Sequence, residues 1–125
     1  MRNKFVKSIM AFLISLIFFN GVLLLQNKGA DLKRGKKIYD TFCATCHGKQ
    51  GKGDGPGSVG LKPKPRDFTD KNYMDKLSDE HLFKVISEGG AAVGKSPLMP
   101  AWKTSIKKED IYNVIAYIRT FSQKK

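Results

Sequence analysis

The feature that most constrains this chain is the spacing of its two cysteines, because Cys43 and Cys46 lie three residues apart and His47 follows directly. Two cysteines this close cannot join distant segments, so the fold has no disulfide framework. A domain of about 100 residues builds only a marginal apolar core from its own side chains. The chain after Ala30 has this size, so a large apolar group held at the cysteines would complete its core.

The segment Cys43-Ala44-Thr45-Cys46-His47 has the form of a c-type haem attachment site. Two thiols at this spacing can reach the two vinyl groups of one porphyrin, and the adjacent histidine is then placed under the iron. Two other uses of the cysteines stay open. A dithiol redox pair would need a βαβ setting, which the sequence does not indicate. A zinc site would need two further ligands at close spacing, whereas His81 lies far along the chain.

The N-terminal segment differs from the rest in charge and hydropathy. Residues 1–7 are basic and residues 8–25 are uncharged and mostly apolar, which is the form of an export signal. The apolar run would make roughly 27 Å of helix, close to the ~30 Å hydrocarbon layer. Lys28 disfavours signal cleavage after Ala30. We therefore expect residues 1–25 to be a retained signal anchor, with a cleaved signal peptide as the alternative, and residues 26–30 to be a short linker.

Residues 31–125 are predicted to form one all-α domain. One helix is expected over residues 31–42, a second is capped by Ser78 and ends at Gly89, and a third begins near residues 105–107. The buried face of the third helix is predicted to hold Ile111, Val114, Ile115, Ile118 and Phe121. Residues 48–65, rich in Gly and Pro, and residues 97–102 are predicted loops. No strand pattern competes with this assignment.

A second iron ligand would be needed for an electron carrier, and a thioether would raise the reduction potential relative to a second imidazole. Met99 is the best candidate, because Pro97 and Pro100 stiffen the loop around it. Met74 and His81 are the competing candidates. For Met74 the alternative role is packing in a loop, and for His81 it is a solvated helix position.

The chain is basic, with a formal net charge of +12. Its eleven acidic residues all follow Ala30, and the part after Ala30 is still basic. This balance favours acidic protein surfaces or anionic headgroups as partners. Nucleic acid is not expected, because the lysines are scattered and are not interleaved with an aromatic stacking platform.

From Ala30 onward the sequence resembles a class I cytochrome c of the small bacterial type. The matching elements are Gly35 and Tyr39, Cys43 to His47, Gly55-Pro56, Met99 to Trp102, and Val114 to Arg119. The resemblance implies a small cytochrome c fold of three to five helices wrapped around one haem c, preceded here by one N-terminal hydrophobic helix. The haem is then attached covalently through Cys43 and Cys46, with His47 and Met99 as iron ligands.

The same resemblance implies roles for several other residues. Gly35 and Tyr39 of the first helix are expected to cross Val114 and Tyr117 of the last helix. The carbonyl of Pro56 is expected to accept a hydrogen bond from the ring of His47. Arg66 and Trp102 are candidate partners of the haem propionates, and the alternatives are a surface arginine and a core tryptophan.

The expected function is single-electron transfer by a monohaem c-type cytochrome, alone or as a subunit of a larger oxidoreductase complex, with no small-molecule substrate transformed. The expected partners are redox proteins, above all membrane-bound complexes with acidic docking surfaces, and the membrane itself. The expected location is the outer, periplasmic face of the cytoplasmic membrane, or the soluble periplasm if the signal is cleaved. Two rivals remain: a haem enzyme or sensor with a displaceable sixth ligand, and a haem-free dithiol or metal protein.

Overall fold

The computed structural model describes residues 29–123. The predicted anchor, residues 1–25, and residues 26–28 of the predicted linker lie outside this part. Between residues 29 and 123 no strand occurs, and no helix is long and apolar enough to cross a bilayer. The helices are α2 (Leu32–Phe42), α3 (Ala44–His47), η1 (Pro56–Ser58), α4 (Lys71–Met74), α5 (Asp79–Glu88), η2 (Gly90–Val93) and α6 (Lys108–Gln123).

The three longer helices, α2, α5 and α6, confirm the helical prediction, and local sequence explains their ends. The Asp31 carboxylate accepts a hydrogen bond from the backbone N–H of Arg34 at 3.0 Å and so caps α2. Ser78 caps α5 in the same way through the N–H of His81, at 3.1 Å. Gly89, with φ of +85°, ends α5 in a conformation that favours glycine.

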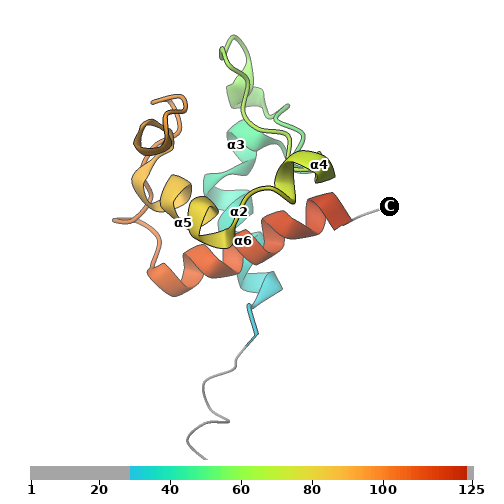
Figure 1. Ribbon diagram of the computed structural model, residues 1–125, viewed down its shortest axis with the longest axis vertical. Coiled ribbons are helices and arrows are strands. Elements are labelled where there is room, and N and C mark those ends of the chain that lie inside the picture. Colours follow the sequence, from blue (N-terminus) through green and yellow to red (C-terminus); the bar gives the residue numbers. More distant parts are fainter. Residues whose placement is uncertain (1–28, 124–125) are drawn as a thin grey trace, which may run out of the picture.

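The core forms where α6 crosses α2, and this pair makes the most extensive contact between helices (Figure 1). A side chain at Gly35 would overlap the backbone carbonyl of Asn113, so only glycine permits this approach. Tyr39 is fully buried and its ring centroid lies 5.4 Å from that of Tyr117. The predicted apolar face of α6 is buried as expected: Ile111, Val114, Ile115, Ile118 and Phe121.

Arginines connect α6 to the segments around it. Arg34 of α2 places Nη2 2.7 Å and Nε 2.9 Å from the carboxylate of Asp110. Arg119 donates to the carbonyl of Met74 at 2.7 Å and to Asp79 at 2.8 Å. The contacts of Arg119 hold the end of α4 and the start of α5 against the C-terminal half of α6, and Asp70 caps the single turn Lys71–Met74.

The Arg34–Asp110 pair predicts a measurable acid sensitivity. Hydrogen bonds from Arg34 hold the pKa of Asp110 below its ordinary value. A lowered folded-state pKa means that the pair stabilises the fold above the ordinary aspartate pKa of about 3.9 and that this stabilisation is lost as the pH falls through the folded-state value. Asp110→Asn should therefore flatten the acid limb of a plot of unfolding midpoint against pH. The exposed pair inside α2 provides the control, since Asp40→Asn should flatten the plot less.

Candidate functional site

The cysteine segment sits at the end of α2, where Cys43 ends that helix and begins α3. The N–H of His47 donates to the carbonyl of Cys43 at 2.9 Å, so one helical turn separates Cys43 from His47. Both cysteines are free, Cys43 being buried and Cys46 half-buried. The single turn of α3 therefore carries two thiols and one imidazole in a fixed relation.

The imidazole of His47 is held by its Nδ1 atom. This atom lies 3.1 Å from the backbone carbonyl of Arg66. Because a carbonyl only accepts, Nδ1 carries the hydrogen and Nε2 keeps its lone pair. Burial lowers the pKa of His47, against a smaller opposing effect of the bond to Arg66. A neutral imidazole whose Nδ1 is held by a hydrogen bond can bind a metal ion through its Nε2 atom.

The acceptor of this hydrogen bond differs from the one that the resemblance implied. The expected acceptor was Pro56, and in the structure it is Arg66. Pro56 begins the turn Pro56–Ser58, which packs against α3, where a side chain at Gly57 would lie 3.2 Å from Sγ of Cys46. The chain then returns past His47 at residues 65–68, where the N–H of Phe68 donates to Gly51 at 2.6 Å. This return brings the Arg66 carbonyl to the ring.

The predicted propionate partners are both engaged with aromatic rings. The guanidinium of Arg66 lies 3.6 Å from the ring centroid of Tyr73. Trp102 is half-buried, with its ring 5.2 Å from that of Phe42, and its backbone N–H donates to Ile86 at 3.0 Å. Their contacts to a propionate stay a prediction.

The three candidates for a second iron ligand lie in different surroundings. Met99 is half-buried and packs against the core, and its carbonyl accepts from the N–H of Gly90 at 3.0 Å. Met74 is fully buried in the core, which fits the packing role. His81 is half-buried in the first turn of α5. The loop that carries Met99 is thus connected by a backbone hydrogen bond to Gly90, the first residue of η2.

Burial makes Cys43 a weak nucleophile. Burial raises the pKa of Cys43 to about 12. Reactive cysteines of redox motifs have the opposite shift, because the thiolate is the nucleophile. In residues 29–123 no three His, Cys, Asp or Glu side chains gather as a metal-binding group.

Comparison with known proteins decides the family. The family model "Cytochrome c" matches residues 32–122. The chain belongs to the cytochrome c family. Its members carry covalently attached haem c, and the predicted cofactor, held by Cys43 and Cys46, is thereby confirmed.

Relatives of this cytochrome c include a cytochrome that matches over nearly its whole length and a subunit of a cbb3-type oxidase that matches over part of its length. Cytochrome c-554(547) of Halothiobacillus neapolitanus is 33% identical, over 72% of this chain and 96% of that protein. The cbb3-type cytochrome c oxidase subunit FixP of Bradyrhizobium diazoefficiens is 31% identical, over 78% of this chain and 30% of the subunit. This cytochrome c therefore spans about a third of that oxidase subunit. The solved structure of the KustC0563 c-type cytochrome has a TM-score of 0.55 and 30% identity, over 70% and 95% of the two chains.

The residues of this cytochrome c fit haem c in their donor chemistry. Two thiols without a disulfide, an imidazole with a free Nε2, and a half-buried thioether are the groups that such a cofactor uses. Cys43 and Cys46 would hold the haem covalently, and His47 and Met99 are the candidates that would bind its iron.

Two residues at the site were not predicted from the sequence as parts of it. Phe68 stacks on the imidazole of His47, with ring centroids 4.4 Å apart and an angle of 15° between the planes. The hydroxyl of Tyr39, known from the sequence only as a helix-crossing residue, donates to the Gly48 carbonyl at 2.7 Å. Phe68 is separated from the cysteines by a long loop, so no helical or strand period in the sequence predicts that it contacts His47.

Proposed function

We propose that this chain is a monohaem c-type cytochrome that carries single electrons between protein partners. The observation that carries the proposal is the imidazole of His47, which has Nδ1 fixed by a backbone carbonyl and lies within one helical turn of two free thiols. When bound, haem c supplies a one-electron iron couple. The chain's own residues attach the group, fix the ligand ring and exclude water from its surroundings. Met99 supplies the second iron ligand in this proposal.

The experiment that tests this function is a redox titration of the purified, matured protein with optical detection. We expect one reversible one-electron transition, a low-spin spectrum in both states and slow binding of carbon monoxide to the reduced form. A five-coordinate spectrum with rapid carbon monoxide binding would instead support the rival haem enzyme or sensor. The rival needs an open sixth position, whereas an electron carrier keeps both ligands.

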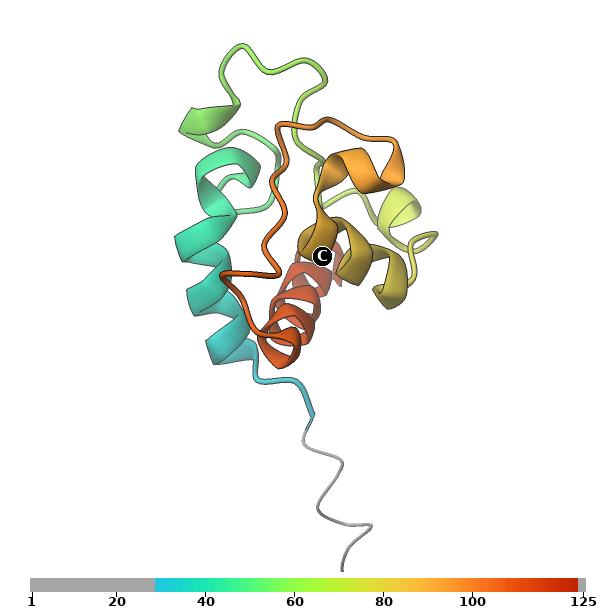
Figure 2. The same ribbon diagram turned by 90° about the vertical axis from the view of Figure 1, so that its left-hand side faces the viewer.

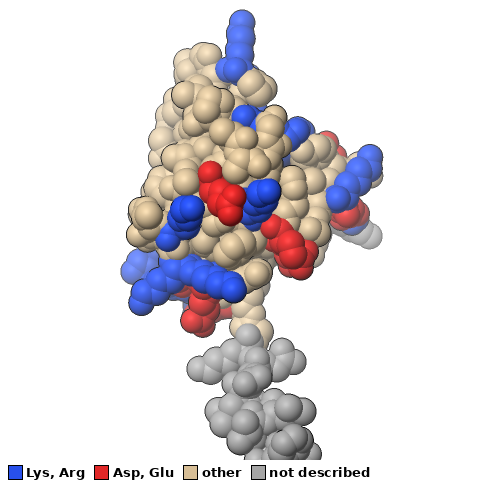
Figure 3. Space-filling model, turned by 60° about the vertical axis from the view of Figure 1, so that its left-hand side comes forward, with Lys and Arg blue, Asp and Glu red and all other residues tan. Residues whose placement is uncertain are grey.

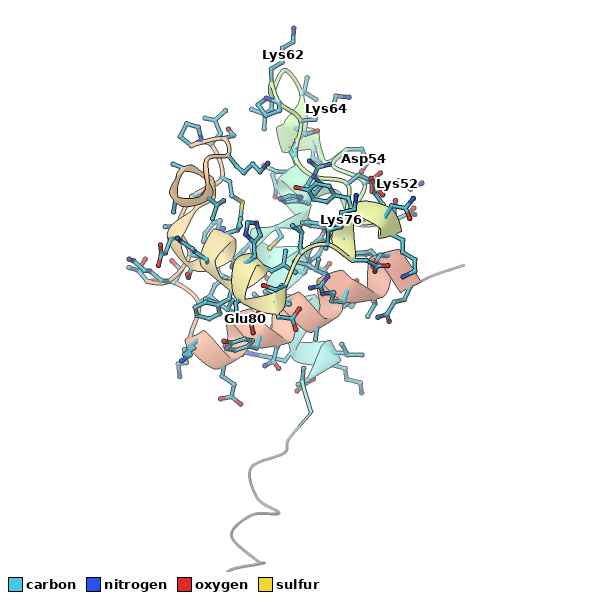
Figure 4. All side chains as sticks on the ribbon, viewed as in Figure 1. Lys52, Asp54, Lys62, Lys64, Lys76 and Glu80 are labelled. Carbon is cyan, nitrogen blue, oxygen red and sulfur yellow. The ribbon has the colours of Figure 1, made fainter. Side chains whose placement is uncertain are left out.

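Two loops form the proposed docking surface for redox partners. Residues 55–66 and 89–108 contain no acidic residue. They carry two exposed apolar side chains, Val59 at 85% and Leu98 at 63% exposure. Lys62 and Lys64 project from the end of the molecule opposite to the exit of residues 29–30 (Figure 4). An apolar centre with basic surroundings fits a partner that has an apolar patch inside an acidic rim.

A charge-reversal experiment tests this docking surface. Lys62→Glu with Lys64→Glu should slow electron transfer to an acidic partner at low salt by roughly tenfold or more, because steering by charge raises association rates by 10–10³. The loss should shrink as the ionic strength rises. The control, Lys33→Glu with Lys37→Glu, makes the same change in net charge on α2. Equal slowing by both pairs would show that net charge, and not this surface, governs association.

The proposed location is the outer face of the cytoplasmic membrane, with residues 1–25 as an anchor. The basic residues 1–7 and the apolar residues 8–25 support an N-terminus on the cytoplasmic side and a translocated haem domain. Membrane-bound redox complexes are then the partners within reach. Mass spectrometry of the native N-terminus, together with membrane fractionation, tests the anchor. A mature chain that begins near Ala30 and a purely soluble fraction would replace it with a periplasmic carrier.

A further inference from the structure

The ring of Phe68 lies face to face with the iron-binding imidazole. The centroid distance to His47 is 4.4 Å and the interplanar angle is 15°, which is a stacked arrangement. Phe68 is 8% exposed, so the contact is inside the protein. Stacking on one face limits rotation of the imidazole about its Cβ–Cγ bond, because rotation would drive ring atoms into the phenyl group.

The backbone near Phe68 also restrains the imidazole of His47. Residues 65–68 lie close against the glycines that follow His47, since a side chain at Gly53 would overlap the carbonyl of Pro65. The N–H of Phe68 donates to Gly51 at 2.6 Å. Within this short stretch the Arg66 carbonyl lies 3.1 Å from Nδ1 of His47. Residues 65–68 thus restrain the imidazole in two ways, because the Arg66 carbonyl holds its Nδ1 atom and the Phe68 ring stacks on its plane.

Phe68 also contacts an aromatic cluster in the core. The Phe68 ring lies 6.4 Å from Tyr39 in an edge-on arrangement, and Tyr39 lies 5.4 Å from Tyr117. Tyr39 and Tyr117 belong to the two helices that cross at Gly35. Interiors are close-packed, so a buried ring in contact with this cluster cannot shift its position without opening a void or displacing a neighbour. The α2–α6 crossing is thereby connected mechanically to the plane of the His47 imidazole.

We propose that Phe68 is a positioning residue that sets the plane of the His47 imidazole, and with it the orientation of this ligand about its bond to the iron. The inference rests on the proposed function, because it gives Nε2 of His47 to haem iron. It adds a residue that acts through His47 without binding the iron. The orientation of a ligand ring alters the electronic structure of the iron site, so the effect reaches spectra and potential.

The test compares two phenylalanine variants in the matured full-length protein. Phe68→Leu keeps a buried apolar side chain but removes the flat stacking face. Phe83→Leu is the matched control, because Phe83 stacks on Tyr112 and not on His47. The ring centroids of this pair lie 5.0 Å apart and the interplanar angle is 23°. In proton NMR spectra of the oxidised protein, the four haem methyl shifts report the orientation of the axial ligand planes. We expect Phe68→Leu to change their order or spread, and Phe83→Leu to leave them as in the wild type.

Unchanged methyl shifts in Phe68→Leu would overturn the proposal and leave Phe68 as core packing alone. A measurement on the wild type covers the case in which this variant does not fold. In the reduced protein, nuclear Overhauser contacts are expected between the ring protons of Phe68 and His47, and their absence would also overturn the proposal. Failure of the proposed function looks different, since the wild type itself would then lack a histidine-ligated haem spectrum.

Discussion

Met99→Ala should abolish the sixth iron ligand while the haem stays attached through Cys43 and Cys46. We expect the reduction potential to fall by on the order of a quarter of the roughly 0.8 V range that axial ligands set. The physical reason is that a thioether favours the reduced iron relative to water or an imidazole in its place. The measurement is an optical redox titration, accompanied by carbon monoxide binding to the reduced variant, which should become fast.

The other methionine between residues 29 and 123, Met74, provides the matched control for this prediction. Met74 is fully buried in the core, and its carbonyl accepts from Arg119. Met74→Leu is a nearly volume-conserving change and should cost less than ~1.5 kcal/mol of stability. Its reduction potential and spectrum should match the wild type. If Met74→Leu lost the low-spin spectrum and Met99→Ala kept it, the ligand assignment would be reversed.

Gly35→Ala should destabilise the fold strongly, although alanine is the better helix former. The preference of a helix for alanine over glycine is worth about 1 kcal/mol. Against it stands overlap of the new methyl group with the Asn113 carbonyl, a backbone atom that cannot rotate away. Overpacking typically costs about 1–3 kcal/mol, and here α2 and α6 would have to separate. We expect a net loss near the upper end of that range.

Chemical denaturation of the matured protein measures this loss. Gly29→Ala serves as the control, because a side chain there meets no atom within 4 Å. Gly29→Ala should leave the denaturation midpoint unchanged. If Gly35→Ala were as stable as the wild type, the close helix crossing would not be a determinant of the fold.

The three longer helices were predictable because short-range chemistry determines them. Asp31 and Ser78 cap helices that their own sequences favour, and the apolar period of α6 matches its buried face. The one-turn helix α4 was not predicted. Nucleating a single turn is unfavourable by itself, and here Asp70 caps the turn while Arg119, 45 residues after Met74, binds its end.

The part of the site formed by neighbouring residues in the sequence was predictable. The part whose position depends on the course of the loop of residues 48–68 was not. Cys43, Cys46 and His47 lie in one turn, so their relation follows from helix geometry. The carbonyl that binds His47 depends on how residues 48–68 fold back, and the family resemblance implied Pro56 whereas the acceptor is Arg66. Phe68 reaches the imidazole through the same closure. No local period encodes such a contact.

The N-terminal end of the domain and the loop of residues 55–66 lie far apart on the molecule. In Figure 2 the chain leaves the domain beside the start of α2, while the loop of residues 55–66 stands at the opposite end. The space-filling view shows lysines and arginines spread over the domain, with Asp and Glu side chains between them on its lower part (Figure 3). The proposed docking surface and the N-terminal end of the described domain thus lie at opposite ends of the molecule (Figure 2).

The central claim is that Cys43 and Cys46 carry one haem c. The most direct measurement is a pyridine haemochrome assay combined with peptide mass mapping, on full-length protein matured in a host that exports it and attaches haem. The account predicts one haem c per chain, bound to a single peptide that contains both cysteines. Protein of the native fold with both thiols free or joined in a disulfide, and with no haem on that peptide, would contradict it.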